Sequence, residues 1–147
     1  MFTVLVCDDD AAILESLRIY LSQEGYRVLC ARDGLEALEQ VQGEEIHCMV
    51  LDIMMPRLDG LKTTLKLREK YNFPIILLSA KSEDTDKIAG LGFGADDYVT
   101  KPFNPLELTA RVKSQIRRYV RLGSLEVRES QLVTGGLVLD TDTKEVT

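Results

Sequence analysis

Short apolar runs rich in β-branched residues alternate five times along this chain with longer stretches of helical periodicity. The runs predict five strands, at Thr3–Cys7, Arg27–Ala31, His47–Leu51, Pro74–Ser79 and Asp97–Val99. Strand–helix alternation at this spacing is typical of βαβ units with right-handed crossovers. We therefore expect an α/β fold, in which a five-stranded parallel sheet is covered by helices on both faces.

Apolar residues at helical spacing between the runs predict which helix faces cover the sheet. These residues are Ile13, Leu14, Leu17 and Leu21 in the first helix, Leu35, Leu38 and Val41 in the second, Leu61 and Leu65 in the third, Ile88 and Leu91 in the fourth, and Leu108, Val112 and Ile116 in the fifth. Ligands of such sheets bind outside the carboxyl ends of the strands. The residues that directly follow each strand are therefore the candidate site.

Composition and charge restrict the class of protein. A chain of 147 residues with 45% hydrophobic residues is long and apolar enough for one compact domain. Its net charge of −6 argues against binding nucleic acid or an anionic membrane by charge alone. The longest apolar run is far shorter than the roughly 20 residues that span a bilayer, and no signal-peptide pattern opens the chain. We expect a soluble, cytoplasmic protein without membrane contact.

The cysteines and the single histidine do not form a recognisable catalytic or metal-binding pattern. Cys7, Cys30 and Cys48 lie in strand-like apolar runs and lack the pairwise spacing of a zinc site, which favours buried reduced thiols. His47 precedes the third predicted strand, and we expect it at the surface. With one histidine in the chain, a Ser/His/Asp hydrolase and a phosphohistidine transmitter are both disfavoured.

Polar side chains with complementary chemistry follow four of the predicted strands. They are Asp8, Asp9 and Asp10 after the first, Asp52 after the third, Ser79 after the fourth and Lys101 after the fifth. Clustered carboxylates repel one another, and Mg²⁺ relieves this with carboxylate, water and phosphoryl oxygens as ligands. A carboxylate beside Mg²⁺, a lysine and a hydroxyl is suited to accepting a phosphoryl group. The alternative for an acidic triplet is a helix N-cap, which we assign to Asp10.

Four motifs, in this order and after the expected strands, make residues 1–118 resemble the receiver domain of bacterial two-component response regulators. They read V-L-V-C-D-D-D, L-D-I-M-M-P-x-L-D-G, L-L-S-A and G-A-D-D-Y-V-T-K-P-F. The resemblance implies a (βα)5 flavodoxin-like fold with strand order 2-1-3-4-5. It also implies that Asp52 is the phospho-acceptor, that Asp9, Asp52 and the Met54 backbone carbonyl ligate Mg²⁺, and that Asp8 acts through a metal-bound water.

The same resemblance implies roles for residues after the fourth and fifth strands. Lys101 would pair with the phosphoryl oxygens, and its peptide bond to Pro102 is expected to be cis. Ser79 and Tyr98 would form a switch pair, in which the hydroxyl of Ser79 donates to the phosphoryl group and Tyr98 turns inward. The phosphoryl donor would be a sensor histidine kinase or a small acyl phosphate. The only catalysis expected is the receiver's own phosphorylation and dephosphorylation.

A charged face on the fifth strand and the last helices resembles the surface through which receivers of the winged-helix (OmpR/PhoB-like) subfamily form homodimers. The expected interface residues are Lys87, Leu91, Asp96, Asp97, Glu107, Ala110, Arg111 and Arg118. Lys87 would pair with Glu107, and Asp97 with Arg111, across a two-fold axis. The alternative is a set of solvated charges, each of little energetic value. Within the family, the stretch A-D-D-Y-V-T-K-P-F-N-P-L-E-L-T-A-R-V-K-S-Q-I-R-R-Y resembles regulators of vancomycin resistance.

The pattern changes after residue 118. Residues 119–131 mix charged and small residues and are interpreted as a helix end and linker, with Arg117, Arg118 and Arg121 favoured there by the helix dipole. Residues 132–147 resemble the opening β-hairpin of a winged-helix DNA-binding domain, of which the rest is absent. The expected function is transcription control, with DNA bound only through that missing domain.

Two further functions stay open. A stand-alone receiver would act through protein contacts only, which the linker and hairpin argue against. A haloacid-dehalogenase-like phosphatase also has a nucleophilic aspartate after a parallel strand, but it uses a second acid two residues later. Met54 occupies that position, which disfavours an enzyme with an external substrate.

Overall fold

The sheet is the predicted one. The computed structural model describes residues 1–55, 57–79 and 94–134, with side chains as far as residue 122. Its strands are β1 (Thr3–Cys7), β2 (Arg27–Ala31), β3 (Cys48–Asp52), β4 (Ile75–Ser79) and β5 (Asp97–Thr100). They pair in parallel in the order β2-β1-β3-β4-β5. The α/β fold and its flavodoxin-like strand order are thereby confirmed.

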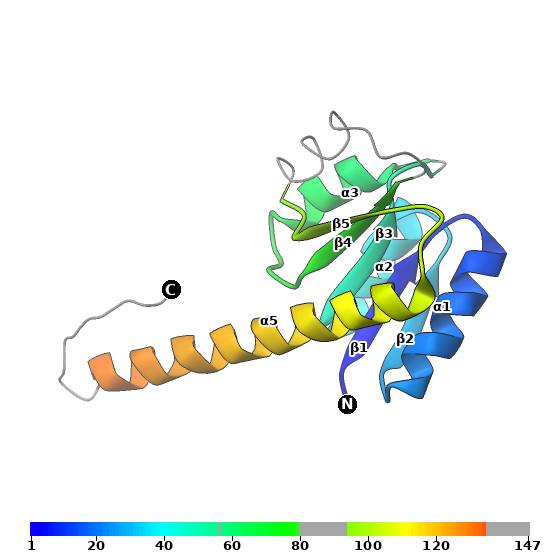
Figure 1. Cartoon of the computed structure of the whole chain (residues 1–147). Helices are drawn as coiled ribbons and strands as arrows, with labels where there is room; N and C mark the ends of the chain where they lie inside the picture. The colour runs from blue at the N-terminus through cyan, green and yellow to red at the C-terminus, as the bar shows by residue number, and fades with distance from the viewer. Residues whose placement is uncertain (56, 80–93, 135–147) are drawn as a thin grey trace.

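Helices cover both faces of this sheet (Figure 1). They are α1 (Ala11–Gln23), α2 (Gly34–Gly43), α3 (Gly60–Leu67) and α5 (Pro105–Thr134). Helices α1 and α5 pack on one face, and α2 and α3 pack on the other. The predicted fourth helix, with Ile88 and Leu91, lies outside the described residues.

The core is divided into two layers by the pleat of the strands. Val4 and Val6 of β1 point to the α1–α5 side, whereas Leu5 and Cys7 point to the α2–α3 side. All residues of β1, β3 and β4 are buried, as expected for parallel strands covered on both faces. The pairing of these buried strands therefore holds their carboxyl ends in register.

Two leucines assigned to the core are instead exposed. Leu35 of α2 is 43% exposed and Leu65 of α3 is 52% exposed. The buried sides of these helices consist largely of small residues, because the helices approach each other closely. A Cβ atom on Gly34 would lie 2.1 Å from Thr63 Oγ1, so this crossing has no room for a larger side chain. Apolar periodicity cannot detect a helix face built from glycine, alanine and threonine.

His47 is also placed differently from the prediction. Its side chain is only 16% exposed, because Nδ1 accepts a hydrogen bond from the Thr3 backbone N–H at 3.0 Å and the ring packs edge-on against Phe2. The three cysteines are free, as predicted, although Cys30 is only partly buried. Burial raises the pKa of the Cys7 and Cys48 thiols well above the ordinary range, which keeps them protonated.

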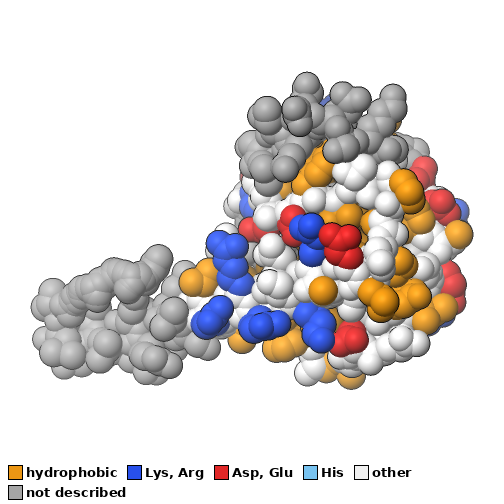
Figure 2. All heavy atoms as spheres, in the orientation of Figure 1, with side chains coloured by type: hydrophobic (Ala, Val, Ile, Leu, Met, Phe, Trp, Pro, Cys, Tyr) orange, Lys and Arg blue, Asp and Glu red, His pale blue; other side chains and the backbone are white. Residues whose placement is uncertain are grey.

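Helix α5 is longer than the sequence pattern indicated. It runs without interruption to Thr134, so residues 119–131 are helical throughout instead of forming a helix end and linker. In Figure 1 its C-terminal half extends away from the sheet, and in Figure 2 basic side chains gather along α5. Arg117, Arg118 and Arg121 therefore lie well before the C-terminal end of α5, and the helix-dipole explanation for them is wrong. Residues 132–134 belong to α5, and the rest of the expected hairpin lies outside the described residues.

No helix in the described part of the chain combines the length and the apolar character needed to cross a bilayer.

Candidate phosphorylation and metal site

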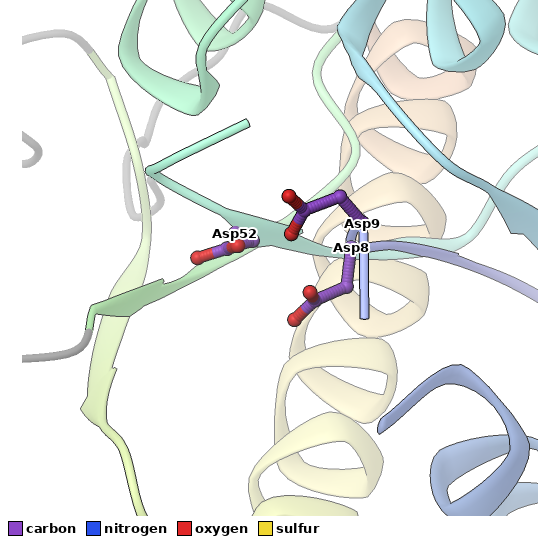
Figure 3. Close-up of side chains that lie close together, drawn as sticks. All are labelled: Asp8, Asp9 and Asp52. Atoms are coloured by element: carbon purple, nitrogen blue, oxygen red, sulfur yellow. The ribbon is translucent and has the colours of Figure 1, made fainter. Parts of the chain in front are cut away.

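Three carboxylates meet at the carboxyl edge of the sheet. Asp8 and Asp9 follow β1, and Asp52 is the last residue of β3, which pairs with β1 in parallel register. One oxygen from each of the three lies within 4.8 Å of the others, and in Figure 3 the carboxylates of Asp8 and Asp9 extend toward the side on which Asp52 lies. Asp8 and Asp52 are buried, whereas Asp9 is exposed. The cluster therefore opens to solvent on the Asp9 side.

The acidic triplet has divided roles. Asp10 is the N-cap of α1, and its side chain accepts a hydrogen bond from the Ala12 N–H, as predicted. The Asp10 N–H in turn donates to Asp8 Oδ1 at 2.9 Å, which holds the Asp8 carboxylate turned inward. The turn between β1 and α1 thus orients one carboxylate toward the cluster and uses another to start the helix.

Among the described residues, Lys101 is the only lysine whose ammonium group forms an ion pair with this cluster. Its Nζ lies 2.9 Å from Asp8 Oδ2 and 3.4 Å from Asp52 Oδ2. Its backbone N–H donates to the Ser79 carbonyl oxygen at 2.6 Å, which joins the ends of β4 and β5. The peptide bond between Lys101 and Pro102 is cis, as the resemblance implies. The structure therefore brings together side chains at the carboxyl ends of β1, β3 and β5.

The balance of charge in the cluster is negative. Burial, and then the charge of Asp8, raise the pKa of Asp52 to about 6, against the opposing effects of Lys101 and the Met54 N–H. Burial lowers the pKa of Lys101, but its contacts with Asp8 and Asp52 outweigh this and raise it, so the ammonium is charged at neutral pH. The cluster holds three carboxylates, and the one ammonium that pairs with it contacts Asp8 and Asp52. This excess of carboxylate oxygens is a donor set that fits Mg²⁺.

The segment after β3 folds back over the phospho-acceptor candidate. The Met54 N–H donates to Asp52 Oδ1 at 3.4 Å, while Met54 as a residue is 71% exposed. The Gly60 N–H donates to the Ile53 carbonyl oxygen at 2.9 Å. A Cβ atom on Gly60 would lie 2.3 Å from the Asp52 carbonyl oxygen, so only glycine permits this approach. The Met54 N–H therefore lies beside Asp52, and the role of the Met54 carbonyl oxygen as a Mg²⁺ ligand stays a prediction.

The two switch candidates lie on neighbouring strands. Ser79 is buried at the end of β4, and Tyr98 is half-buried on β5, packed against the apolar layer under α2 and α3. Ser79 pairs in register with Thr100, so its side chain and Lys101 belong to the same edge of the sheet. The structure thus places Ser79 at the site edge and Tyr98 farther back along β5.

The expected dimer face is exposed, but its charges pair within one chain. Arg111 Nη1 lies 2.9 Å from Asp97 Oδ1, and its Nη2 lies 3.2 Å from Glu107 Oε2. Asp96 pairs with Arg68 at 2.6 Å. Ala110 and Arg118 are exposed on α5, while Lys87 and Leu91 lie outside the described residues. The pair Asp97–Arg111, expected across a two-fold axis, is thus formed here inside one protomer.

Sequence reasoning missed two residues beside the site. Asp33 is the N-cap of α2, and its carboxylate also binds the guanidinium of Arg57 from the segment after β3. An aspartate before a helix start is a visible signal for the cap. The pairing with Arg57 has no sequence signal, because it depends on how two loops approach each other.

The comparisons with known proteins agree with this geometry. The family model described as the response regulator receiver domain matches residues 4–113. The chain belongs to the response regulator receiver family. This receiver is 46% identical to the regulatory protein VanR of Enterococcus faecium over 143 residues, which are 97% of this chain and 62% of VanR. It is 44% identical over 145 residues to the alkaline phosphatase synthesis transcriptional regulatory protein PhoP of Bacillus subtilis, covering 95% of this chain and 60% of PhoP.

A solved structure supports similarity to the OmpR/PhoB subfamily of response regulators. The response regulator DrrB, an OmpR/PhoB homologue from Thermotoga maritima, superimposes with a TM-score of 0.74 at 39% identity. The match covers 80% of this chain and 54% of DrrB. The receiver chain spans about half to three-fifths of the length of the curated relatives it matches. It is a receiver similar to those of OmpR/PhoB-type transcription regulators, vancomycin-resistance regulators among them, with an acidic cluster typical of Mg²⁺ binding.

Proposed function

We propose that this receiver accepts a phosphoryl group on Asp52 from a phosphohistidine of a sensor kinase and thereby controls transcription. The observation that carries the proposal is the setting of Asp52: a buried carboxylate with two further carboxylates and the ammonium of Lys101 around it. This is the arrangement that phosphoryl transfer onto a carboxylate requires.

Different residues of this chain would have different roles in the phosphoryl transfer. Asp9, Asp52 and the Met54 carbonyl would ligate Mg²⁺, with Asp8 acting through water; the ion would neutralise charge on the phosphoryl oxygens. A carboxylate oxygen of Asp52 forms the new O–P bond while the N–P bond of the phosphohistidine breaks. The leaving imidazole keeps the electron pair and takes up a proton. Lys101 pairs with the transferred phosphoryl group. The receiver catalyses only its own phosphorylation and dephosphorylation.

A hollow next to Lys101 supports docking of the kinase. It has a volume of about 480 Å³ and lies between α1 and the segment after β5. Ile13 and Phe103 give it an apolar lining, and Ser16 and Lys101 add polar groups. An apolar surface of this kind beside the acceptor would seat a kinase helix that carries the phosphohistidine.

Phosphorylation would change the surface formed by β5 and α5. The hydroxyl of Ser79 would donate to the phosphoryl group, and Tyr98 would turn inward. Asp97 and Arg111 would exchange their intrachain contact for the same contact across a two-fold axis. The resulting homodimer would position DNA-binding domains and so control transcription, which fits the similarity to the transcriptional regulatory protein PhoP. DNA would be bound outside residues 1–134.

Acetyl phosphate labelling tests the acceptor. Wild-type protein with Mg²⁺ should incorporate one phosphoryl group, and Asp52→Asn should incorporate none. Asp10→Asn is the matched control, because asparagine caps a helix as well as aspartate does and Asp10 lies next to the cluster without joining it. Label retained in Asp52→Asn, or lost equally in Asp10→Asn, would contradict the assignment of Asp52.

A further inference from the structure

The segment that follows β3 is tied to the segment that follows β2 by one ion pair. Arg57 Nε and Nη2 both donate to Asp33 Oδ2, at 2.8 and 2.5 Å. Asp33 Oδ1 accepts from the Glu36 N–H at 2.9 Å, so both oxygens of this carboxylate are engaged. The Asp33 side chain is 8% exposed. A buried carboxylate used in this way fixes the position of the guanidinium that binds it.

The backbone of Arg57 adopts a conformation that this contact helps to explain. Its φ angle is 68°, in the left-handed region that residues other than glycine rarely occupy. Such conformations persist where surrounding contacts hold them, and they concentrate at functional sites.

Two more contacts join these elements. Cys7 Sγ lies 3.4 Å from Met55 Sδ and donates to the Asp33 carbonyl oxygen at 3.2 Å. Gly34 packs so closely that a Cβ atom on it would lie 2.6 Å from the Leu58 carbonyl oxygen. The end of β1, the start of α2 and the segment after β3 thus meet at one junction. The ion pair is its only charged contact among the described residues.

The junction is connected to the carboxylate cluster through the chain. Met54 lies next to Met55 in the chain, and its N–H points to Asp52 Oδ1 at 3.4 Å. We propose that Asp33 and Arg57 are a positioning pair, which holds the Met54 peptide beside Asp52 and so sets the affinity of the aspartate cluster for Mg²⁺. This inference rests on the proposed function. Contacts that orient metal ligands typically change metal affinity 10- to 100-fold, and we expect about tenfold here.

The Asp33–Arg57 ion pair should affect the geometry of the carboxylate cluster more than it affects the free energy of unfolding. Although Asp33 is buried, the Arg57 side chain is 55% exposed, so solvent screens the charge of this ion pair and its contribution to stability is small. Arg27 and Glu44 form a comparable ion pair at 2.6 Å at the opposite end of the sheet, where β2 begins. That pair is a matched control, because its chemistry is the same and the carboxylate cluster is at the other end of the strands.

Calorimetric titration with MgCl₂ of the unphosphorylated protein tests the proposal. Asp33→Asn keeps the helix cap but removes the charge, and Arg57→Gln removes the guanidinium. Each should weaken Mg²⁺ binding about tenfold with little change in melting temperature. The double variant should be no weaker than either single variant, because the two residues act as one unit. Arg57→Lys should recover part of the affinity, and Arg27→Gln should match the wild type.

Arg57→Gly separates the ion pair from the backbone conformation, because glycine adopts positive φ freely. It should bind Mg²⁺ as weakly as Arg57→Gln. Wild-type affinity in Arg57→Gly, or affinities within twofold of wild type in both Asp33→Asn and Arg57→Gln, would overturn the positioning role. Additive losses in the double variant would also overturn it. Failure of the proposed function would be seen in the wild type instead of the variants. In that case the wild-type protein would neither bind Mg²⁺ nor be labelled at Asp52.

Discussion

Asp52→Asn should make the receiver more stable in the absence of Mg²⁺, although it removes the proposed acceptor. In the folded protein the pKa of Asp52 is about 6, against an ordinary value of 3.8. The folded state therefore holds this proton more tightly than the unfolded state does. Unfolding free energy contributed by this group is highest below pH 3.8, falls between pH 3.8 and 6, and stays low above pH 6.

The size of this stabilisation follows from the two pKa values of Asp52, in the folded protein and in the unfolded chain. Each tenfold change in proton affinity corresponds to about 1.4 kcal/mol, so the difference between 3.8 and about 6 corresponds to about 3 kcal/mol at neutral pH. Asparagine removes the charge but keeps a buried polar group and loses the contact between Lys101 and Asp52. We therefore expect a gain of about 1–3 kcal/mol at pH 7.5 and almost none at pH 4.

Urea unfolding followed by circular dichroism, with EDTA present, measures this directly. Asp10→Asn is the control and should change the unfolding free energy by less than about 0.5 kcal/mol, since asparagine caps equally well. Adding Mg²⁺ should narrow the difference, because the ion binds the folded wild type better than the variant. The reasoning is refuted if Asp52→Asn is less stable than wild type at pH 7.5, or if its gain is the same at pH 4.

Three further predictions address the metal, the fold and the dimer. Mg²⁺ should raise the wild-type melting temperature, and Asp9→Ala should remove most of that rise while Asp10→Ala leaves it in place; an unchanged rise in Asp9→Ala would exclude Asp9 as a ligand. Arg68 donates to the carbonyl oxygens of Gly94 and Phe73 and pairs with Asp96. Arg68→Ala should therefore lower the unfolding free energy by about 2 kcal/mol in urea titrations, whereas Arg27→Ala at an exposed pair should cost under about 0.5 kcal/mol. Mg²⁺ with beryllofluoride, which mimics the acyl phosphate, should shift the protein from monomer to dimer in sedimentation velocity, and Arg111→Ala should reduce that shift; a wild type that stays monomeric would rule out the dimer.

Some features of the site could be predicted because parallel strands leave little freedom. Once the strands are parallel and in register, Asp8, Asp9, Asp52 and Lys101 must emerge at one edge, whatever the loops do. The same holds for Ser79 at the end of β4. The roles given to these residues remain proposals, but their proximity follows from the order of strands and the alternation of the chain.

Other features depended on contacts that no local pattern encodes. Leu35 and Leu65 satisfy helical periodicity, yet close packing at Gly34 and Thr63 leaves the buried side to small residues. The small and charged residues after 118 were interpreted as a linker, yet most of them are compatible with a helix, and α5 continues to Thr134. Arg111 has carboxylates within reach in its own chain, so its charge alone could not identify its partner.

The sequence by itself determined the α/β fold, the edge at which the chemistry gathers and the family to which the receiver belongs. Hydrophobic alternation and strand-end residues are local properties, and they carry this information directly. Only the tertiary structure decided that Asp33 binds Arg57, that Cys7 meets Met55 and that Asp97 pairs with Arg111 in one chain. These contacts join residues from different loops or elements, and the approach of those elements is set by packing, a positive φ angle and missing Cβ atoms.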